Sequence, residues 1–407
     1  MSQNKVVVIG AGHAGGTLVA LLRREGFDGQ ITLIGSEVHS PYHRPPLSKS
    51  FDGENVKWLH EPSFYDSQEI TTIFGDTVVS IDRDQHQVQL ASGSQVDYDF
   101  LVLATGAEPR RLNLPGEDLE GISVLRSLDD ADRLKEAINT GKSLAIVGGG
   151  YIGLEVAAAA RERGVTVTVI EREDRILARV ASPELSRQLT RLHADRGTQI
   201  LTGAQTTGYQ CDFGRVGGVY LADETVVPCE AVLVGAGAIP RDELAREAGL
   251  ACDNGVIVDA RMRTSDPSIM AIGDVANGPV DGLSTPMSRM RVESIPSAVE
   301  QARQAAEAIV GLEPKKDEIP WFWSDQFDLK IKIAGIVHGE FETALRGDVT
   351  DGTFALYHLR DGRLIAAETV NSPKDFMAAK RLLASQSAID AQQLRDPATD
   401  LRSLISA

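Results

Sequence analysis

Six glycines form two copies of a pattern that could bind a nucleotide. The first copy follows the apolar run "VVVI" and the second follows "LAIV"; they contain Gly10, Gly12 and Gly15, and Gly148, Gly150 and Gly153. In such a pattern the first glycine permits a tight strand-to-helix turn, the second lets a pyrophosphate approach the backbone, and the third lets the helix pack closely. The helix N-terminus then faces the phosphate charge. One copy is weak evidence, because these junctions favour glycine anyway, but two copies predict two dinucleotide sites.

An acidic residue refines the second site. Glu171 ends the strand after the second glycine pattern, near the spacing of about 20 residues at which a carboxylate accepts bonds from ribose hydroxyls. A carboxylate there repels a 2′-phosphate, so we expect NADH rather than NADPH. Two alternatives stay open: Arg172 could neutralise a phosphate, or Glu171 could be a solvated strand end. At the first site, Ser36 replaces the simplest carboxylate and Glu37 follows it, so either could bind the ribose.

Composition and charge exclude several classes of protein. The 407 residues suggest two or three domains at about 150 residues each. A net charge of −17 argues against a nucleic-acid binder, which needs a basic surface. No apolar run approaches the roughly 20 residues that span a membrane. The first strand begins too early to leave room for a signal peptide, so we expect a cytoplasmic protein.

Cysteine and histidine spacing indicates no metal site and no disulfide framework. Cys211, Cys229 and Cys252 are scattered, with no Cys-x-x-Cys pair, which predicts reduced thiols. The eight histidines show no spacing typical of metal ligands.

Two apolar strands mark where the chain crosses between domains. Residues 100–103 lead into "ATGAEPR", and residues 231–234 lead into "GAGAIPR". We expect the chain to leave the first nucleotide domain near residue 109 and to return near 240. Residues 269–272 then add a strand to that domain, and a helix follows. The predicted fold class is α/β, with two Rossmann-like dinucleotide-binding domains.

The tail has a different pattern. "DLKIKIAG" alternates apolar and charged residues with the period of a half-buried strand. A hairpin is predicted around Asp361 and Gly362, and a helix is predicted to begin at Ser372. These elements indicate a C-terminal α+β domain.

Six segments together resemble the FAD- and NADH-dependent ferredoxin reductases that serve bacterial haem-thiolate monooxygenases and Rieske-type dioxygenases. They are "YHRPPLSK", "ATGAEPR", "GGGYIGLEVAA", "TSDPSIMAIGD", "RVESIPSAVEQA" and "PWFWSDQ". The resemblance covers nearly the whole chain and implies a glutathione-reductase-like fold. Its domains would be an FAD-binding domain (1–109 and 240–318), an NADH-binding domain (110–239) and a C-terminal domain that walls the flavin (319–407). It also implies that FAD takes a hydride from NADH and passes single electrons to a 2Fe-2S ferredoxin.

The resemblance assigns the cofactor contacts. For FAD they are Gly10, Gly12, Ala14, Glu37, Lys49, Val78, Thr105, Gly106, Arg126, Asp274, Ile295, Trp323 and Gln326. For NADH they are Gly148, Gly150, Tyr151, Ile152, Gly153, Glu155, Glu171 and Gly237. Asp274 would accept bonds from the ribityl hydroxyls. Two positions depart from the family pattern, because Ser36 replaces an acid and Ser297 replaces a common asparagine.

The paired prolines before Lys49 are also explained by the resemblance. In these proteins "RPPLSK" starts a helix beside the isoalloxazine, and proline suits a first helical turn because its missing N–H is not needed there. Lys49 would then face the flavin and pair with Glu155 on the NADH domain, so that both residues act in catalysis. The alternative is that Lys49 is a solvated helix residue.

The absence of a cysteine near "PYHRPPL" distinguishes the chain from the disulfide reductases of this superfamily. Without a thiol, electrons would leave directly from the flavin edge to a protein acceptor, to a small quinone-like or radical acceptor, or to oxygen. The resemblance favours a ferredoxin. The other interpretations are a reductase of the monodehydroascorbate or quinone type, or a mainly regulatory flavoprotein resembling apoptosis-inducing factor.

An electron-transfer surface is the last expectation. Trp323 and Gln326 could contact the flavin ring, although tryptophans of a core are an alternative. A basic patch for an acidic ferredoxin could combine Arg289, Arg291, Arg303, Lys330 and Lys332, or these could be ordinary solvated side chains. We expect a monomer or weak dimer.

Overall fold

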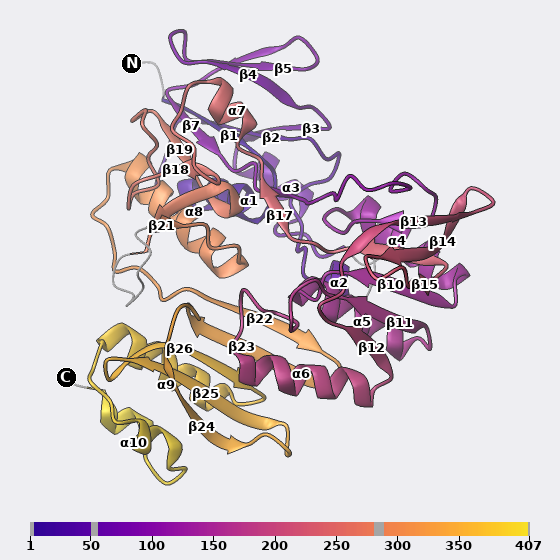
Figure 1. The fold of residues 1–407 in the computed structure, drawn as a ribbon. Coiled ribbons are helices and arrows are strands. Elements are labelled where there is room, and N and C mark those ends of the chain that lie inside the picture. Colours follow the sequence, from indigo (N-terminus) through magenta and orange to yellow (C-terminus); the bar gives the residue numbers. More distant parts are fainter. Residues whose placement is uncertain (1–3, 50–55, 281–288, 406–407) are drawn as a thin grey trace.

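The structure is a computed structural model that describes residues 4–49, 56–280 and 289–405. It contains three units, each built on a five-stranded sheet. Figure 1 shows one sheet at the top, which combines indigo and orange segments, a magenta sheet at the right, and an orange-to-yellow sheet at the lower left.

The first sheet is entirely parallel. Its spatial order is β19 (Ile269–Ala271), β7 (Phe100–Leu103), β1 (Lys5–Ile9), β2 (Gln30–Gly35) and β3 (Ile70–Phe74). The continuous apolar run of β1 is buried, as is typical of parallel strands that are covered on both faces. Its core also includes residues of helices α1 (His13–Arg24) and α8 (Ile295–Val310), which pack together, and of the antiparallel strands β4 (Val78–Asp82), β5 (Gln87–Leu90) and β6 (Gln95–Asp97).

The second sheet repeats this parallel arrangement. Its order is β12 (Thr198–Leu201), β11 (Thr166–Ile170), β10 (Ser143–Val147), β16 (Ala231–Val234) and β9 (Ile122–Ser123). Its helices are α4 (Leu128–Thr140), α5 (Tyr151–Glu162) and α6 (Pro183–Asp195). Strands β13 (Thr206–Asp212), β14 (Arg215–Leu221) and β15 (Val226–Pro228) form a separate antiparallel sheet. The predicted strands at 100–103 and 231–234 are thus confirmed as β7 and β16, and so is the α/β fold class.

A two-stranded antiparallel ribbon connects the parallel sheets. It consists of β8 (Ala107–Pro109) and β17 (Ala238–Pro240). The first sheet therefore takes strands from both before and after the second. The remaining described elements before β22 are α2 (Pro46–Lys49), α3 (Pro62–Ser67), α7 (Glu243–Glu247), β18 (Val256–Ile257), the 3-10 turn η1 (Gly273–Val275), β20 (Ala276–Pro279) and β21 (Arg289–Met290).

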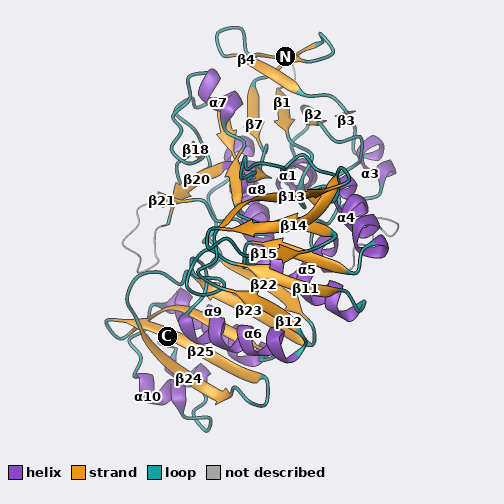
Figure 2. Cartoon of the chain, turned by 45° about the vertical axis from the view of Figure 1, so that its right-hand side comes forward, coloured by secondary structure: helices purple, strands orange, loops and turns teal. Residues whose placement is uncertain are grey.

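The C-terminal unit is an antiparallel sheet with helices, as predicted. Its order is β22 (Trp321–Gln326), β23 (Leu329–Gly335), β26 (Arg363–Val370), β25 (Thr353–Arg360) and β24 (Glu342–Asp348). Helices α9 (Pro373–Ser385) and α10 (Ala391–Arg395) and the 3-10 turn η2 (Leu401–Leu404) follow. One set of apolar side chains packs with α9 and α10, and another packs with α5 and α6 of the second unit. Figure 2 shows α6 beside β12 and the C-terminal sheet.

Candidate functional site

A cavity of about 1910 Å³ lies where the three units meet. Ligands of open parallel sheets bind outside the carboxyl ends of the strands, and both glycine turns contribute to the wall at these ends. The cavity exceeds the range of about 300–1,000 Å³ that suits one small ligand, so it has room for two. Every predicted cofactor contact except Gln326 lines it: Gly10, Gly12, Ala14, Glu37, Lys49, Val78, Thr105, Gly106, Arg126, Asp274, Ile295, Trp323, Gly148, Gly150, Tyr151, Ile152, Gly153, Glu155, Glu171 and Gly237.

The first glycine turn is shaped for a pyrophosphate. Gly10 has φ +115°, and a Cβ there would lie 2.1 Å from the backbone oxygen of Ala104. A Cβ on Gly12 would meet nothing within 4 Å, so this position faces open cavity. Helix α1 begins after Gly12 without a side-chain cap, which leaves its first amide groups to bind an anion. The residues present therefore fit the diphosphate of FAD.

The second turn repeats this geometry. Gly148 has φ +112°, and a Cβ there would lie 2.4 Å from the backbone oxygen of Gly235. Gly150 faces open space, and α5 begins after it without a side-chain cap. Glu171 Oε2 accepts a bond of 2.7 Å from the Gly149 N–H, and so the carboxylate stands against the glycine turn. This set fits a second dinucleotide whose ribose hydroxyls reach Glu171.

An ion pair in the cavity wall joins the first two units. Lys49 Nζ, at the end of α2, lies 2.7 Å from Glu155 Oε1 on α5, and the Glu155 side chain is only 6% exposed. The predicted Lys49–Glu155 contact is thus present. Two hydroxyls also donate hydrogen bonds to this carboxylate. Ser48 Oγ lies 2.5 Å from Oε2, and Ser324 Oγ of β22 lies 2.7 Å from Oε1. Glu155 therefore contacts all three units.

The sequence interpretation did not include Ser48 and Ser324. Ser48 is adjacent to Lys49 and could have been suspected for that reason. Ser324 could have been predicted only from the alternation of side chains along β22, in which Phe322 and Ser324 point to the same face of the strand. Phe322 contacts Tyr151 with ring centroids 4.7 Å apart, which fixes that side toward α5.

Three polar side chains form a compact cluster in the cavity wall after β2: Glu37, Tyr42 and Arg44. Glu37 Oε2 accepts from the Tyr42 hydroxyl at 2.6 Å, and Glu37 Oε1 accepts from Arg44 Nη2 at 2.6 Å. Burial raises the pKa of Tyr42 above its usual range, so that its proton stays available to donate. Ser36 is exposed, whereas Glu37 is half-buried and already oriented. These contacts favour Glu37 over Ser36 at the ribose, although the assignment stays a prediction.

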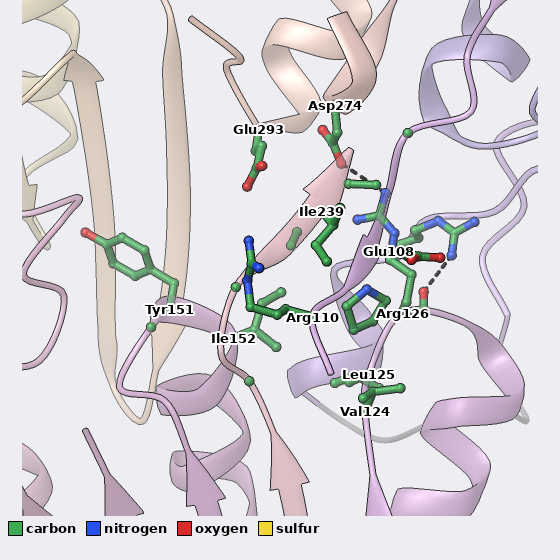
Figure 3. A pocket seen from close by; sticks show the side chains of 18 of the residues that line it. Glu108, Arg110, Val124, Leu125, Arg126, Tyr151, Ile152, Ile239, Asp274 and Glu293 are labelled. Carbon is green, nitrogen blue, oxygen red and sulfur yellow. Dashed lines mark hydrogen bonds and ion pairs between the residues drawn. The ribbon is translucent and has the colours of Figure 1, made fainter. Parts of the chain in front are cut away.

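Arg126 and Asp274 form a second ion pair in the cavity wall. Arg126 Nη2 lies 2.9 Å from Asp274 Oδ2. Figure 3 shows this pair across the cavity from Tyr151, with Arg110 in between. Asp274 belongs to η1, which follows β19 after Ile272 and so lies near the carboxyl end of that strand, where the sequence predicted a carboxylate for ligand hydroxyls.

A histidine lies in the wall where α1 begins. His13 is 8% exposed, and its Nε2 lies 3.3 Å from His43 Nδ1. Burial lowers the pKa of His13 to about 3, with a smaller contribution from His43. The imidazole is therefore neutral at physiological pH.

The predicted contact of Gln326 with the flavin ring is wrong. Gln326 is fully buried, does not line the cavity, and bonds to Ser324 and His193. Trp323 does line the cavity and lies on the opposite face of β22, with its ring 5.7 Å from that of Trp321. Side chains alternate along a strand, so two residues three positions apart cannot share a face.

The five residues of the predicted basic patch differ in their exposure and pairing. Arg291 is only 9% exposed and bonds to Glu293 and to the Asp274 backbone, so its proposed exposure is wrong. Arg303 is 17% exposed and pairs with Glu300 and Glu307. Exposed groups remain at Arg289, which bonds to backbone oxygens, and at Lys330. Lys332 is half-buried and lies 5.3 Å from the ring centroid of Phe376.

No cysteine lies among the described residues that line the cavity. Cys211 is exposed, whereas Cys229 is buried and its pKa is raised to about 12 by that burial. Within the described ranges, no three histidine, cysteine or acidic residues are grouped to hold a metal ion. Across the same part of the chain, no helix is both long and apolar enough to cross a bilayer.

Two family models match the chain. Residues 4–302 match the pyridine nucleotide-disulphide oxidoreductase model, and residues 321–405 match the reductase C-terminal model. Among curated relatives, a probable ferredoxin reductase of Castellaniella defragrans is 45% identical and covers 99% of each chain. The ferredoxin–NAD(+) reductase subunit of a Pseudomonas putida benzene 1,2-dioxygenase system is 37% identical over 99% of this chain and 98% of the relative.

Two solved structures of ferredoxin reductases have the same fold as this chain. The chain matches the reductase in a covalent putidaredoxin reductase–putidaredoxin complex with a TM-score of 0.95 and 36% identity, covering 100% and 99% of the two chains. It matches the ferredoxin reductase of the CYP199A2 system from Rhodopseudomonas palustris with a TM-score of 0.95 and 38% identity, covering 99% and 100%.

Proposed function

Because the chain belongs to the pyridine nucleotide-disulphide oxidoreductase family, we propose that it is an FAD-dependent NADH:ferredoxin reductase that supplies an oxygenase with electrons. FAD, when bound, accepts a hydride from NADH and releases electrons one at a time. The residues of this chain hold, orient and shield the two nucleotides.

The Lys49–Glu155 ion pair is the observation that carries the proposal. Both residues line the cavity that the two glycine turns also line, and the pair connects α2 with α5 at 2.7 Å. A cation fixed at this point can orient the reacting rings, because positioning supplies much of the rate of a transfer between two bound molecules. No described cysteine lines the cavity, and so the site lacks the thiol that a disulfide reductase requires.

Each unit has a separate part in this proposal. Residues 1–109 and 240–318 bind FAD, with the pyrophosphate on the first glycine turn and the ribityl hydroxyls on Asp274. Residues 110–239 bind NADH, with Glu171 accepting bonds from its ribose and rejecting a 2′-phosphate. Residues 319–407 wall the flavin, with Trp323 in the cavity lining.

The electron acceptor is an acidic 2Fe-2S ferredoxin that docks near the tryptophans of β22. Trp321 and Trp323 both line the cavity, and Lys380 Nζ lies 5.5 Å from the ring centroid of Trp321. Lys330 and Lys332 of β23, which pair with Asp325 and Trp323 of β22, add positive charge beside these tryptophans. Complementary charge speeds such encounters even where it adds little affinity. The protein acts in the cytoplasm as a monomer or weak dimer.

Stopped-flow measurements with the FAD-loaded protein test the proposal. We expect NADH to bleach the flavin rapidly and NADPH to do so slowly. Reduction of a 2Fe-2S ferredoxin should then exceed reduction of quinones in rate, and it should fall steeply as salt rises, because salt screens exposed charges.

Other results would assign another activity. Rapid turnover with quinones and none with any ferredoxin would indicate a reductase of small acceptors. A long-lived reduced complex that reacts slowly with every acceptor would indicate a regulatory flavoprotein.

A further inference from the structure

A line of buried hydrogen bonds runs from Glu155 into the interface between α6 and the C-terminal sheet. Ser324 Oγ donates to Glu155 Oε1 at 2.7 Å, and Gln326 Nε2 donates to Ser324 Oγ at 3.1 Å. Gln326 Oε1 lies 3.0 Å from Nε2 of His193, which belongs to α6. Ser324, Gln326 and His193 are all fully buried, and none of them lines the cavity.

The chemistry of each group sets the direction of every bond. An amide oxygen can only accept, so His193 carries a proton on Nε2 and donates it to Gln326. That bond turns the amide NH₂ of Gln326 toward Ser324. Because the Ser324 oxygen accepts there, its own single proton is directed to the Glu155 carboxylate, which only accepts when ionised. All three bonds thus donate toward Glu155.

The far end of the line is consistent with this direction. His193 Nδ1 is buried and has no hydrogen-bond partner among the described residues. A proton on Nδ1 would therefore lack an acceptor, whereas a neutral ring with its proton on Nε2 leaves only a lone pair without a partner. Burial also lowers the pKa of His193 below its usual value, which favours the neutral ring.

We propose that Ser324, Gln326 and His193 are positioning residues that hold the Glu155 carboxylate oriented for Lys49. Lys49 Nζ and Ser324 Oγ both contact Oε1, so the serine limits where the ammonium group can sit. Hydrogen bonds to an ionised group are shorter and stronger than neutral ones, which suits such a role. The C-terminal unit thereby orients an ion pair that belongs to the other two. The effect on hydride transfer rests on the proposed function, whereas the effect on Lys49 itself does not.

Two variants interrupt the line at different points. Ser324→Ala removes the donor to Glu155, and Gln326→Met removes the donor that directs the serine while keeping a side chain of similar length. The matched control is Ser182→Ala. Ser182 is equally buried in the same interface, and its hydroxyl donates to a different carboxylate, that of Glu368.

The first measurement is the rate at which an amine-acylating reagent labels Lys49 in the FAD-loaded protein without NADH, followed by mass spectrometry. Lys5, in an exposed ion pair with Asp97, is the internal reference. We expect labelling of Lys49 to rise several-fold in Ser324→Ala and Gln326→Met, and to stay unchanged in Ser182→Ala. The second measurement is flavin reduction at saturating NADH, which should slow about tenfold in Ser324→Ala, in line with the loss of a hydrogen bond to a charged group.

Two results would overturn the proposal. One is unchanged Lys49 labelling in both Ser324→Ala and Gln326→Met. The other is an equal change in Ser182→Ala, which would show general loosening of the interface. If wild-type flavin were not reduced by NADH at all, the proposed function would fail, yet the labelling rates would still decide this inference. Ser324→Thr, which retains the hydroxyl, should restore slow labelling.

Discussion

Replacing Glu155 with glutamine tests how strongly the ion pair holds the units together. Glutamine keeps the shape and one accepting oxygen but removes the charge that faces Lys49 at 2.7 Å. At an effective dielectric constant of about 20, two unit charges at this distance attract by about 6 kcal/mol before the cost of removing them from water. Breaking a fully buried pair costs about 3–5 kcal/mol. Because Lys49 is 22% exposed and can partly rehydrate, we expect a loss of about 2 kcal/mol.

Urea unfolding, followed by tryptophan fluorescence, measures this loss. The matched control is Asp97→Asn, which breaks the Lys5–Asp97 pair at a similar distance of 2.9 Å but with side chains 37% and 53% exposed. Exposed pairs contribute about 0–1 kcal/mol, so the control should unfold close to wild type. The same Glu155→Gln protein should also reduce its flavin more slowly with NADH. A loss no larger than that of the control, together with an unchanged reduction rate, would refute both roles of the pair.

Four further predictions follow from the described contacts. Gly10→Ala should abolish FAD binding, seen as an absent flavin absorbance in a folded protein, because a Cβ there would overlap a backbone oxygen at 2.1 Å; a yellow variant would contradict this. Glu171→Ser should raise the NADPH-to-NADH ratio of kcat/KM, since the carboxylate beside the glycine turn is removed; an unchanged ratio would place the specificity elsewhere. The folded pKa of His13, about 3, is below the unfolded value of 6.5. The unfolded chain therefore binds the proton first, and stability falls as pH drops from 6.5 toward 3, so His13→Leu should flatten this slope by up to about 1.4 kcal/mol per pH unit. An equally steep urea-midpoint profile in that variant would count against it. Iodoacetamide at pH 8 should modify exposed Cys211, spare buried Cys229 and leave NADH oxidation intact; lost activity on labelling would reveal a required thiol.

Local patterns in the sequence predicted most of the secondary structure near the site. The strands at 100–103 and 231–234 begin and end as predicted, because apolar runs bounded by glycine and proline leave little choice. The C-terminal helix begins at Pro373 with Ser372 as its N-cap, which agrees with the predicted start. These features depend on neighbouring residues, which a sequence displays directly.

Contacts between distant residues were harder to predict. Arg291 forms an ion pair with Glu293 and donates a hydrogen bond to the backbone oxygen of Asp274. These contacts hold its side chain away from the surface. The position of Gln326 depends on which face of β22 meets α6, and thus on His193, more than 100 residues earlier. Alternation alone could have shown that Trp323 and Gln326 point in opposite directions, but it could not have shown which direction leads to the cavity.

The ribbon of β8 and β17 has a consequence for how such a molecule can be assembled or taken apart. Pro109 pairs with Ala238, and neighbouring strands lie about 4.8 Å apart, so the segment between them starts and finishes at nearly one point. A splice at that point joins the two halves of the host sheet without stretching either. A short linker could likewise join the two ends of the segment between β8 and β17. This segment is therefore suited to exchange between related proteins when their coenzyme preference is to be changed.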